Sequence, residues 1–175
     1  MAGLWALLRL TANKGKTVSL EVVQVIDVNK GVYLNLAQAY EAEFSAITEK
    51  LPSQDGLFEL DTPLDSDHAA YLALVDNVPI GFANIRLPNE SDSNFEVCEF
   101  YIIPACRKTQ RSSQLAHAVF TLHPGRWVIK QILGAEYATE FWRRAIQQFG
   151  VPFEQVKQVD DYWGPVTMQQ FEVIG

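Results

Sequence analysis

The sequence predicts an α+β protein with a mixed, largely antiparallel sheet of about seven strands. The first observation is the order of the apolar periodicities, which runs β-α-β-β-β-α-β-α-β-β along the chain. The second is the placement of the helices. Strands that follow one another directly favour antiparallel pairing, whereas the later β-α-β-α-β portion favours a parallel pair. A sheet with both kinds of pairing is mixed.

The chain is expected to begin with a strand and a long helix. Residues 17–28 are rich in valine and predict the strand, and Asn29 is a suitable N-cap for the helix after it. The helix is expected over residues 30–50. Its helical spacing is kept by Leu36, Tyr40, Phe44, Ile47 and Leu51. Residues 52–67 are rich in Pro, Ser, Gly and Asp and predict a loop of a length that is often functional.

A hairpin and a buried strand follow. Residues 69–75 and 79–87 flank the turn dipeptide Asp76–Asn77, which predicts the hairpin. The nearly continuous apolar run at 97–103 predicts a strand buried on both faces, and Pro104 ends it. A helix is expected to start near Arg107 or Lys108. The remaining elements are expected at 126–133 (strand), 135–149 (helix with Gly150 as its C-cap), 151–159 (strand) and 166–174 (strand).

Three cations gather where this second helix is expected to begin. Arg107, Lys108 and Arg111 would lie at a helix N-terminus, where the macrodipole disfavours positive charge. A bound anion, above all phosphate, would resolve that conflict. The alternative is a solvated basic turn, and both interpretations stay open at this point.

Composition limits the class of protein. The chain has 175 residues, 48% of them hydrophobic, which suits one domain over residues 17–175. A net charge of −7 argues against nucleic acid as the main ligand. Two cysteines and three histidines show no disulfide framework and no metal-ligand spacing.

The first 16 residues predict an apolar arm. This segment lacks a basic leader region and its apolar run is too short to span a membrane, so we expect a cytoplasmic protein without a membrane partner. Trp5 and its leucine neighbours need cover, either from the body of the protein or from a second copy of the chain. The second alternative is a homodimer.

Three segments together resemble the GNAT superfamily of N-acetyltransferases. They are EFYIIPACRK at 99–108, GRWVIKQI at 125–132 and AEYATEFWRRAI at 135–146, and the last is the most distinctive. The resemblance extends from about Val18 to Ile174. It implies helices on both faces of the sheet, a splayed central strand pair, and acetyl-CoA as the acyl donor that lies between those strands.

The resemblance also implies the residues that hold the cofactor. Segment 107–112 matches an Arg-x-x-Gly-x-Gly/Ala loop whose backbone N–H groups bind pyrophosphate, but Gln110 and Ser112 replace the two small residues. A further departure is Ala135, where related sequences often have Asn. The implied cofactor-binding residues are Ile102, Ile103, Arg107, Lys108, Thr109, Gln110, Arg111, Ser112, Phe141 and Trp142.

Acetyl transfer to an amine needs a general base. Glu99 is the better candidate on the central strand because burial in its apolar run would raise its pKa, and Tyr101 shares its face and would donate or orient. The alternative is an ion pair between Glu99 and a strand cation such as Arg86, Arg126 or Lys130. The family's frequent general-acid tyrosine falls at Trp142, for which we favour core packing.

The expected function is therefore direct transfer of an acetyl group from acetyl-CoA to a primary amine. The expected acceptor is a small-molecule amine, or the N-terminus or a lysine of a peptide. The competing interpretation is a binding module of the same fold whose altered loop has lost acetyl transfer.

Overall fold

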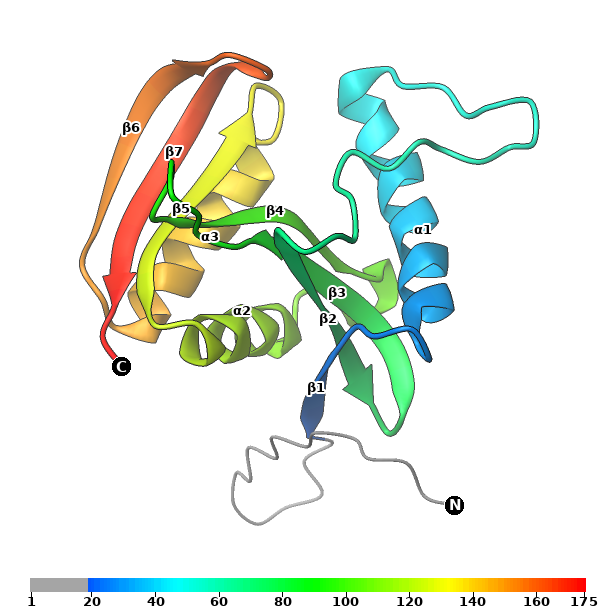
Figure 1. Ribbon diagram of the computed structural model, residues 1–175, viewed down its shortest axis with the longest axis horizontal. Coiled ribbons are helices and arrows are strands. Elements are labelled where there is room, and N and C mark those ends of the chain that lie inside the picture. The colour runs from blue at the N-terminus through cyan, green and yellow to red at the C-terminus, as the bar shows by residue number, and fades with distance from the viewer. Residues whose placement is uncertain (1–18) are drawn as a thin grey trace.

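The structure is a computed structural model that describes residues 19–175 (Figure 1), so the arm predicted over 1–16 lies outside the described residues. No helix between residue 19 and the C-terminus has the length and apolar character needed to cross a membrane. The elements are β1 Leu20–Gln24, α1 Lys30–Thr48, β2 His68–Val75, β3 Val78–Arg86, β4 Phe95–Ile102, the 3-10 turn Pro104–Cys106, α2 Arg111–Leu122, β5 Gly125–Ile132, α3 Glu136–Phe149, β6 Phe153–Asp160 and β7 Gly164–Val173.

The described strands form one seven-stranded sheet in the order β1-β2-β3-β4-β5-β7-β6. Every neighbouring pair is antiparallel except β4 and β5, which run parallel. α2 connects β4 to β5, as a parallel pair requires. The predicted fold class and the order of elements are therefore confirmed.

The parallel pair at the centre of the sheet is short. β4 and β5 pair from Phe95 with Trp127 to Val97 with Ile129, a stretch of three residue pairs. Beyond Val97, β4 runs on to Ile102 and β5 continues to Ile132 without pairing with it. The two strands therefore separate toward their C-terminal ends, which confirms the predicted splay.

Helices cover the two faces of the sheet, as Figure 1 shows. One core cluster lies under α2 and α3 and includes Phe120, Trp127 and Ile146, each at most 1% exposed. The other lies under α1 and is built on Tyr33 and Phe82, whose rings meet edge to face with centroids 4.8 Å apart. Burial of each such side chain contributes about 1.5–3 kcal/mol, so both layers hold the sheet.

Gly81 allows β3 to lie close to β4. A Cβ atom at this position would lie 2.2 Å from the carbonyl oxygen of Tyr101 and 2.5 Å from a side-chain carbon of Ile102. Both distances are far below van der Waals contact. The end of β4 that borders the splay is thus fixed against a glycine on β3.

The start of α2 differs from the prediction. The helix begins at Arg111, not at Arg107 or Lys108, because the 3-10 turn at Pro104–Cys106 is followed by an extended residue and by Lys108 with a φ of +60°. Only Arg111 lies in the first helical turn. The idea that three cations oppose the macrodipole within that turn is therefore wrong.

Asn29 is the N-cap residue of α1, as predicted, but its side chain makes no capping hydrogen bond. It accepts from the N–H of Ile26 and donates to the carbonyl oxygen of Gln24, so it closes the turn before the helix. Leu51 was expected to continue the apolar stripe of the first helix, but it is 84% exposed and does not belong to it. Helical or strand spacing alone cannot tell which end of a stripe remains covered.

Candidate functional site

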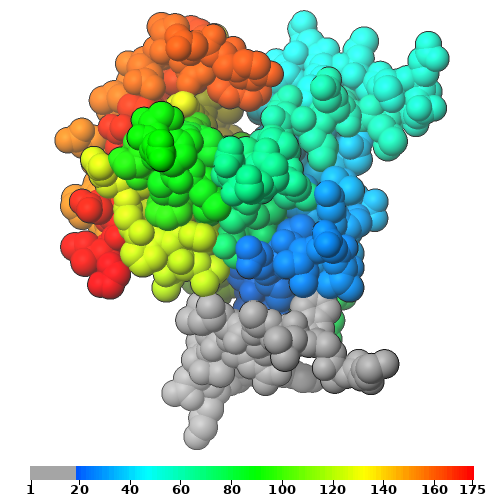
Figure 2. Space-filling view, in the orientation of Figure 1, coloured from blue at the N-terminus to red at the C-terminus, as the bar shows by residue number. Residues whose placement is uncertain are grey.

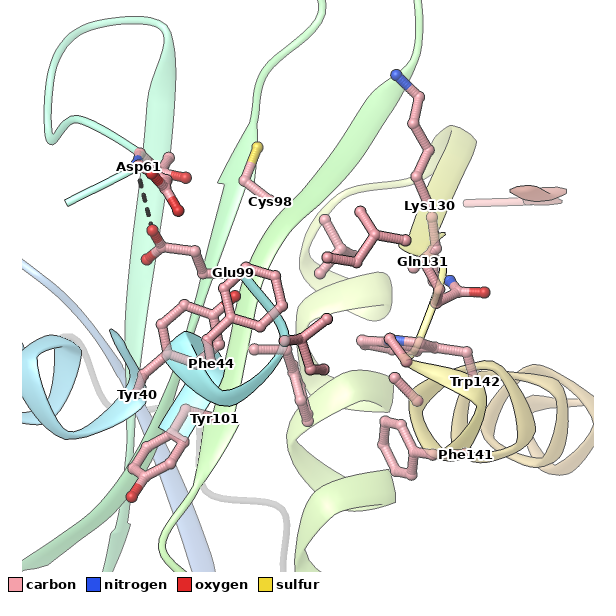
Figure 3. Close-up of a pocket in the computed structure, with 18 of the residues that line it drawn as sticks. Tyr40, Phe44, Asp61, Cys98, Glu99, Tyr101, Lys130, Gln131, Phe141 and Trp142 are labelled. Carbon is pink, nitrogen blue, oxygen red and sulfur yellow. Dashed lines mark hydrogen bonds between the residues drawn. The ribbon is translucent and has the colours of Figure 1, made fainter. Parts of the chain in front are cut away.

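A cavity of about 660 Å³ lies where β4 and β5 separate. One wall comes from α1 and the loop at 61–63, and the other from β5 and α3 (Figure 3). At one end the walls meet, because the rings of Phe44 on α1 and Trp163 in the β6–β7 turn lie 6.2 Å apart edge to face. Figure 2 shows these two segments side by side. The cavity is therefore a deep space within the split sheet.

Glu99 lies at the α1 side of this cavity and is 2% exposed. Its Oε2 accepts a hydrogen bond of 3.0 Å from the hydroxyl of Tyr33, and its Oε1 accepts one of 3.2 Å from the backbone N–H of Thr62. Burial raises the pKa of Glu99 to about 7, although both hydrogen bonds act in the opposite direction. Glu99 is therefore a carboxyl group that can gain or lose a proton near neutral pH.

No cation within residues 19–175 forms an ion pair with Glu99. Arg86 and Lys130 instead contact Glu96, at 2.7 Å and 3.2 Å. Arg126 donates to the hydroxyl of Ser93. The ion-pair alternative for Glu99 is thus wrong. Arg86 and Lys130 form ion pairs with Glu96 on the same strand instead.

Tyr101 lies on the same face of β4 but contacts a different carboxylate. Its hydroxyl donates to Oε1 of Glu43 at 2.9 Å, and burial together with this bond raises its pKa to about 12. The guanidinium of Arg107 lies 5.4 Å from the centre of the Tyr101 ring and contacts the other oxygen of Glu43 at 2.7 Å. Tyr101 therefore belongs to a Glu43–Arg107 cluster and is not hydrogen bonded to Glu99.

The segment before α2 carries backbone N–H groups without acceptors. Among the described residues, none accepts from the N–H of Lys108, Gln110 or Ser112. The hydroxyl of Thr109 accepts from the N–H of Arg111 at 3.3 Å, whereas the N-cap residue Gln110 makes no side-chain capping hydrogen bond. Arg107 and Ser112 line the cavity, whereas Lys108, Thr109, Gln110 and Arg111 do not. The side chain of Arg111 contacts the sulfur of Cys106 at 3.4 Å.

The far wall joins the end of β4 to α3. Ile102, Phe141 and Trp142 line the cavity. Trp142 is 5% exposed and packs edge to face on Phe100 at 4.8 Å, which confirms its predicted core packing. The N–H of Ile103 donates to a β3 carbonyl, so it faces away from the gap.

Sequence reasoning missed the partners of Glu99. Tyr33 falls three residues before Leu36, so the helical spacing of α1 could have included it in the buried stripe. Asn84 donates to the hydroxyl of Tyr33 at 3.0 Å, and both side chains are fully buried. No local signal marks Thr62, because its role depends on where the loop crosses the sheet.

No protein-family model matches the chain, and no curated protein matches it by sequence. Solved structures do match. A ribosomal L7/L12 alpha-N-protein acetyltransferase in complex with coenzyme A is 13% identical with a TM-score of 0.61, over 90% of this chain and 96% of that one. An acetyltransferase from Thermus thermophilus is 17% identical with a TM-score of 0.63, over 88% and 97%. The GNAT domain of PAT from S. lividans is 11% identical with a TM-score of 0.58, over 89% and 91%.

The chain has a GNAT fold. This GNAT fold places the cavity between the two central strands, with Glu99 at one wall and the open N–H groups of 108–112 near the end of β4. At these identities the likeness shows the fold alone.

Proposed function

We propose that the protein is an N-acetyltransferase that moves an acetyl group from acetyl-CoA to a primary amine. The observation that carries this proposal is the position of Glu99, a buried carboxyl group without a cation partner among the described residues, at the wall of a cavity between two separated strands. Structural neighbours supply a consistent chemistry, since one of them is named as an acetyltransferase in complex with coenzyme A.

The residues around the cavity suit such a donor. Pyrophosphate would be held by the open N–H groups of Lys108, Gln110 and Ser112 and by the first turn of α2, where the positive end of the helix dipole lies. Arg111 would add a charged contact. Ile102 and the Phe141–Trp142 wall would hold the apolar arm. Acetyl-CoA, when bound, supplies an activated acyl thioester.

Glu99 would take the proton that the amine loses on attack. Burial raises the pKa of Glu99, whereas Tyr33 and Thr62 donate hydrogen bonds to the charged form and limit the rise, so the pKa lies near neutral pH. Burial and the nearby carboxylate hold the pKa of Tyr33 well above its usual range, so Tyr33 stays protonated and donates. We assign the base role to Glu99. The link of Tyr101 to Glu43 favours a positioning role for Tyr101.

Direct attack by the amine is favoured over a covalent enzyme intermediate. Cys98 is the thiol that lines the cavity among the described residues. Burial raises the pKa of this thiol to about 12, so it stays protonated at neutral pH and is a poor nucleophile. The acceptor would be a small-molecule amine, or the N-terminus or a lysine of a peptide. A cytoplasmic location and a homodimer stay predictions.

The direct test is release of free coenzyme A thiol from acetyl-CoA against a panel of primary amines, peptides and polyamines. Amine-dependent release with at least one acceptor class supports the proposal. A matched panel in which each amine is already acetylated is the control for simple thioester hydrolysis.

A binding module without acetyl transfer is the second candidate function. It is favoured by the contacts of Arg107, whose guanidinium binds Glu43 and the carbonyl oxygen of Ile102 at 2.7 Å each and is thereby occupied. The side chain of Gln110 also adds atoms where glycine would allow close approach. Coenzyme A binding without turnover on any acceptor would support this alternative.

A further inference from the structure

The loop between α1 and β2 is held over Glu99 by a partly buried charge cluster. Nζ of Lys50 contacts Oε2 of Glu41 at 2.9 Å and Oδ1 of Asp61 at 2.6 Å, and it also donates to the carbonyl oxygen of Glu59 at 2.7 Å. The N–H of Asp61 donates to the other oxygen of Glu41 at 3.3 Å. We call Glu41, Lys50 and Asp61 the loop anchor.

The loop anchor contains a buried carboxylate, Glu41, which is unfavourable without a positively charged partner. Glu41 is 1% exposed although it is a carboxylate in the middle of a helix, and burial of a charge is unfavourable without a close partner. Lys50 is that partner. Because Lys50 binds Asp61 at the same time, the compensation of the buried Glu41 is tied to the position of the loop.

A second pair of contacts holds the same loop without charge. Nε2 of Gln38 donates to the carbonyl oxygen of Phe58 at 2.9 Å, and Oε1 of Gln38 accepts from the N–H of Phe58 at 2.8 Å. Gln38 and Glu41 lie three residues apart on α1 and therefore on one face of the helix. The loop is thus attached to α1 at residues 58–61.

The residue after the attached segment is the one that contacts the proposed base. Thr62 is 7% exposed, and its N–H donates to Glu99, as the dashed line beside Asp61 shows in Figure 3. On the other side of this segment, the side chain of Asn84 reaches the carbonyl oxygen of Pro63 at 3.5 Å. Thr62 and Pro63 therefore separate Glu99 from solvent on this side.

We propose that the loop anchor is a positioning device, which keeps Thr62 and Pro63 over Glu99 and so keeps water away from the carboxyl group. Lys50 acts through the loop and is a positioning residue. The proposal rests on the proposed function only where it calls Glu99 the general base. The geometry of the anchor and its effect on Glu99 can be tested without any acceptor.

The direction in which the pKa of Glu99 changes distinguishes exposure of its carboxyl group to water from loss of the positive charge of Lys50. The titratable groups that face Glu99 are Tyr33, Tyr40 and Glu41 of α1, Asp61 of the loop and Cys98 of its own strand, with neutral Asn84 from β3. Removal of the positive charge of Lys50 alone would leave Glu41 and Asp61 uncompensated and would raise the pKa of Glu99. Opening of the loop would remove the N–H of Thr62, which by itself raises the pKa of Glu99, but it would also hydrate the carboxyl group. Hydration would lower the pKa by more, because burial is the largest cause of the shift and water can replace the lost donor.

The experiment is a titration of the side-chain carboxyl carbon of Glu99 by NMR in full-length protein labelled with ¹³C-glutamate, with Glu99→Gln to assign the signal. In wild type the midpoint is expected near the pKa of about 7. In Lys50→Met it is expected to fall by at least about one pH unit toward the ordinary glutamate value. The amide of Thr62 is expected to exchange with solvent at least about tenfold faster.

Two further variants make the result decisive. Lys130→Met is the matched control, since Lys130 also contacts two carboxylates and is 24% exposed against 23% for Lys50, but these carboxylates are Glu96 of β4 and Asp160 at the end of β6, away from the loop. It should leave the Glu99 midpoint unchanged or raise it. Gln38→Ala opens the loop without a change of charge and should lower the midpoint, even if Lys50→Met does not fold.

An unchanged or raised midpoint in Lys50→Met, together with an unchanged midpoint in Gln38→Ala, would overturn the proposal. Failure of the proposed function has a different signature. If wild type shows no amine-dependent thiol release but both loop variants lower the Glu99 midpoint, acetyl transfer is wrong and the loop anchor stands.

Discussion

The hydroxyl of Tyr33 lies 3.0 Å from Oε2 of Glu99 and joins the first helix to the central strand across 66 residues of sequence. Asn84 donates to the same hydroxyl from β3. Three elements thus meet at one carboxyl group under α1. This arrangement makes the proton affinity of Glu99 depend on contacts that can be removed one at a time.

Tyr33→Phe should raise the pKa of Glu99 above its value of about 7. The hydroxyl of Tyr33 donates to the charged carboxylate, so its loss disfavours that form. The ¹³C titration of Glu99 measures this shift. Tyr162→Phe is the control, because Tyr162 is 76% exposed in the β6–β7 turn. A Glu99 midpoint that stays constant or falls in Tyr33→Phe would show that the hydrogen bond does not stabilise the carboxylate.

The contribution of Glu99 to the free energy of unfolding should decrease as pH rises through the range from about 4.5 to about 7. Glu99 has an ordinary value of 4.5 and a folded value of about 7, so over this range the folded state binds the proton more tightly than the unfolded chain. The stabilisation is present below the unfolded value and is lost as pH rises, with a total of about 3 kcal/mol at 1.36 kcal/mol for each pKa unit.

Glu99→Gln isolates this contribution. Urea denaturation of wild type and variant at pH 5 and pH 8 should give a variant that gains stability relative to wild type at the higher pH. The amide side chain introduced by this substitution carries no charge at either pH, so the pH-dependent part of Glu99 disappears. Equal pH dependence in the two proteins would mean that Glu99 titrates in its ordinary range.

Gln110→Gly should tighten coenzyme A binding and Arg111→Ala should weaken it. Glycine would remove the side chain beside the open N–H groups of the 108–112 segment, whereas Arg111 supplies a charged hydrogen bond worth about 1–3 kcal/mol. Isothermal titration calorimetry on both variants measures these changes. Coenzyme A affinities equal to wild type in both variants would mean that the phosphates do not bind at the 108–112 segment.

Gly81→Ala should destabilise the fold by at least about 1–3 kcal/mol. The added methyl group would lie 2.2 Å from the backbone oxygen of Tyr101, which cannot rotate away. Gly31→Ala in α1 is the matched control, because nothing lies within 4 Å of its added Cβ and alanine favours a helix by about 0.5–1 kcal/mol. Thermal unfolding of both variants should therefore show opposite shifts.

Much of the fold was predictable because the spacing of apolar residues and the turn residues identify individual helices and strands from local sequence. The helix expected over 135–149, its Gly150 C-cap and the Asp76–Asn77 hairpin all follow from local patterns, and the structure has each of them. The start of α2 was not predictable from local charge, since the 3-10 turn after Pro104 and the left-handed Lys108 delay the helix to Arg111.

The environment of the candidate site was only partly predictable. Glu99 was identified from a lone acid in an apolar strand, and its burial is confirmed. Its partners come from α1, β3 and the 52–67 loop, and sequence spacing contains no information on which distant backbone N–H will face a carboxylate. The same is true of Glu43, which takes the hydroxyl of Tyr101 that was expected to act beside Glu99.

In the proposed mechanism Glu99 accepts the proton of an attacking amine. The decisive measurement is the turnover of Glu99→Gln with acetyl-CoA and the best acceptor, at the pH optimum of wild type and with coenzyme A affinity measured in parallel. Turnover should fall by well over tenfold, within the range of about 10²–10⁴ typical of a general base, with affinity unchanged. Turnover equal to wild type would contradict the claim and remove Glu99 from the mechanism.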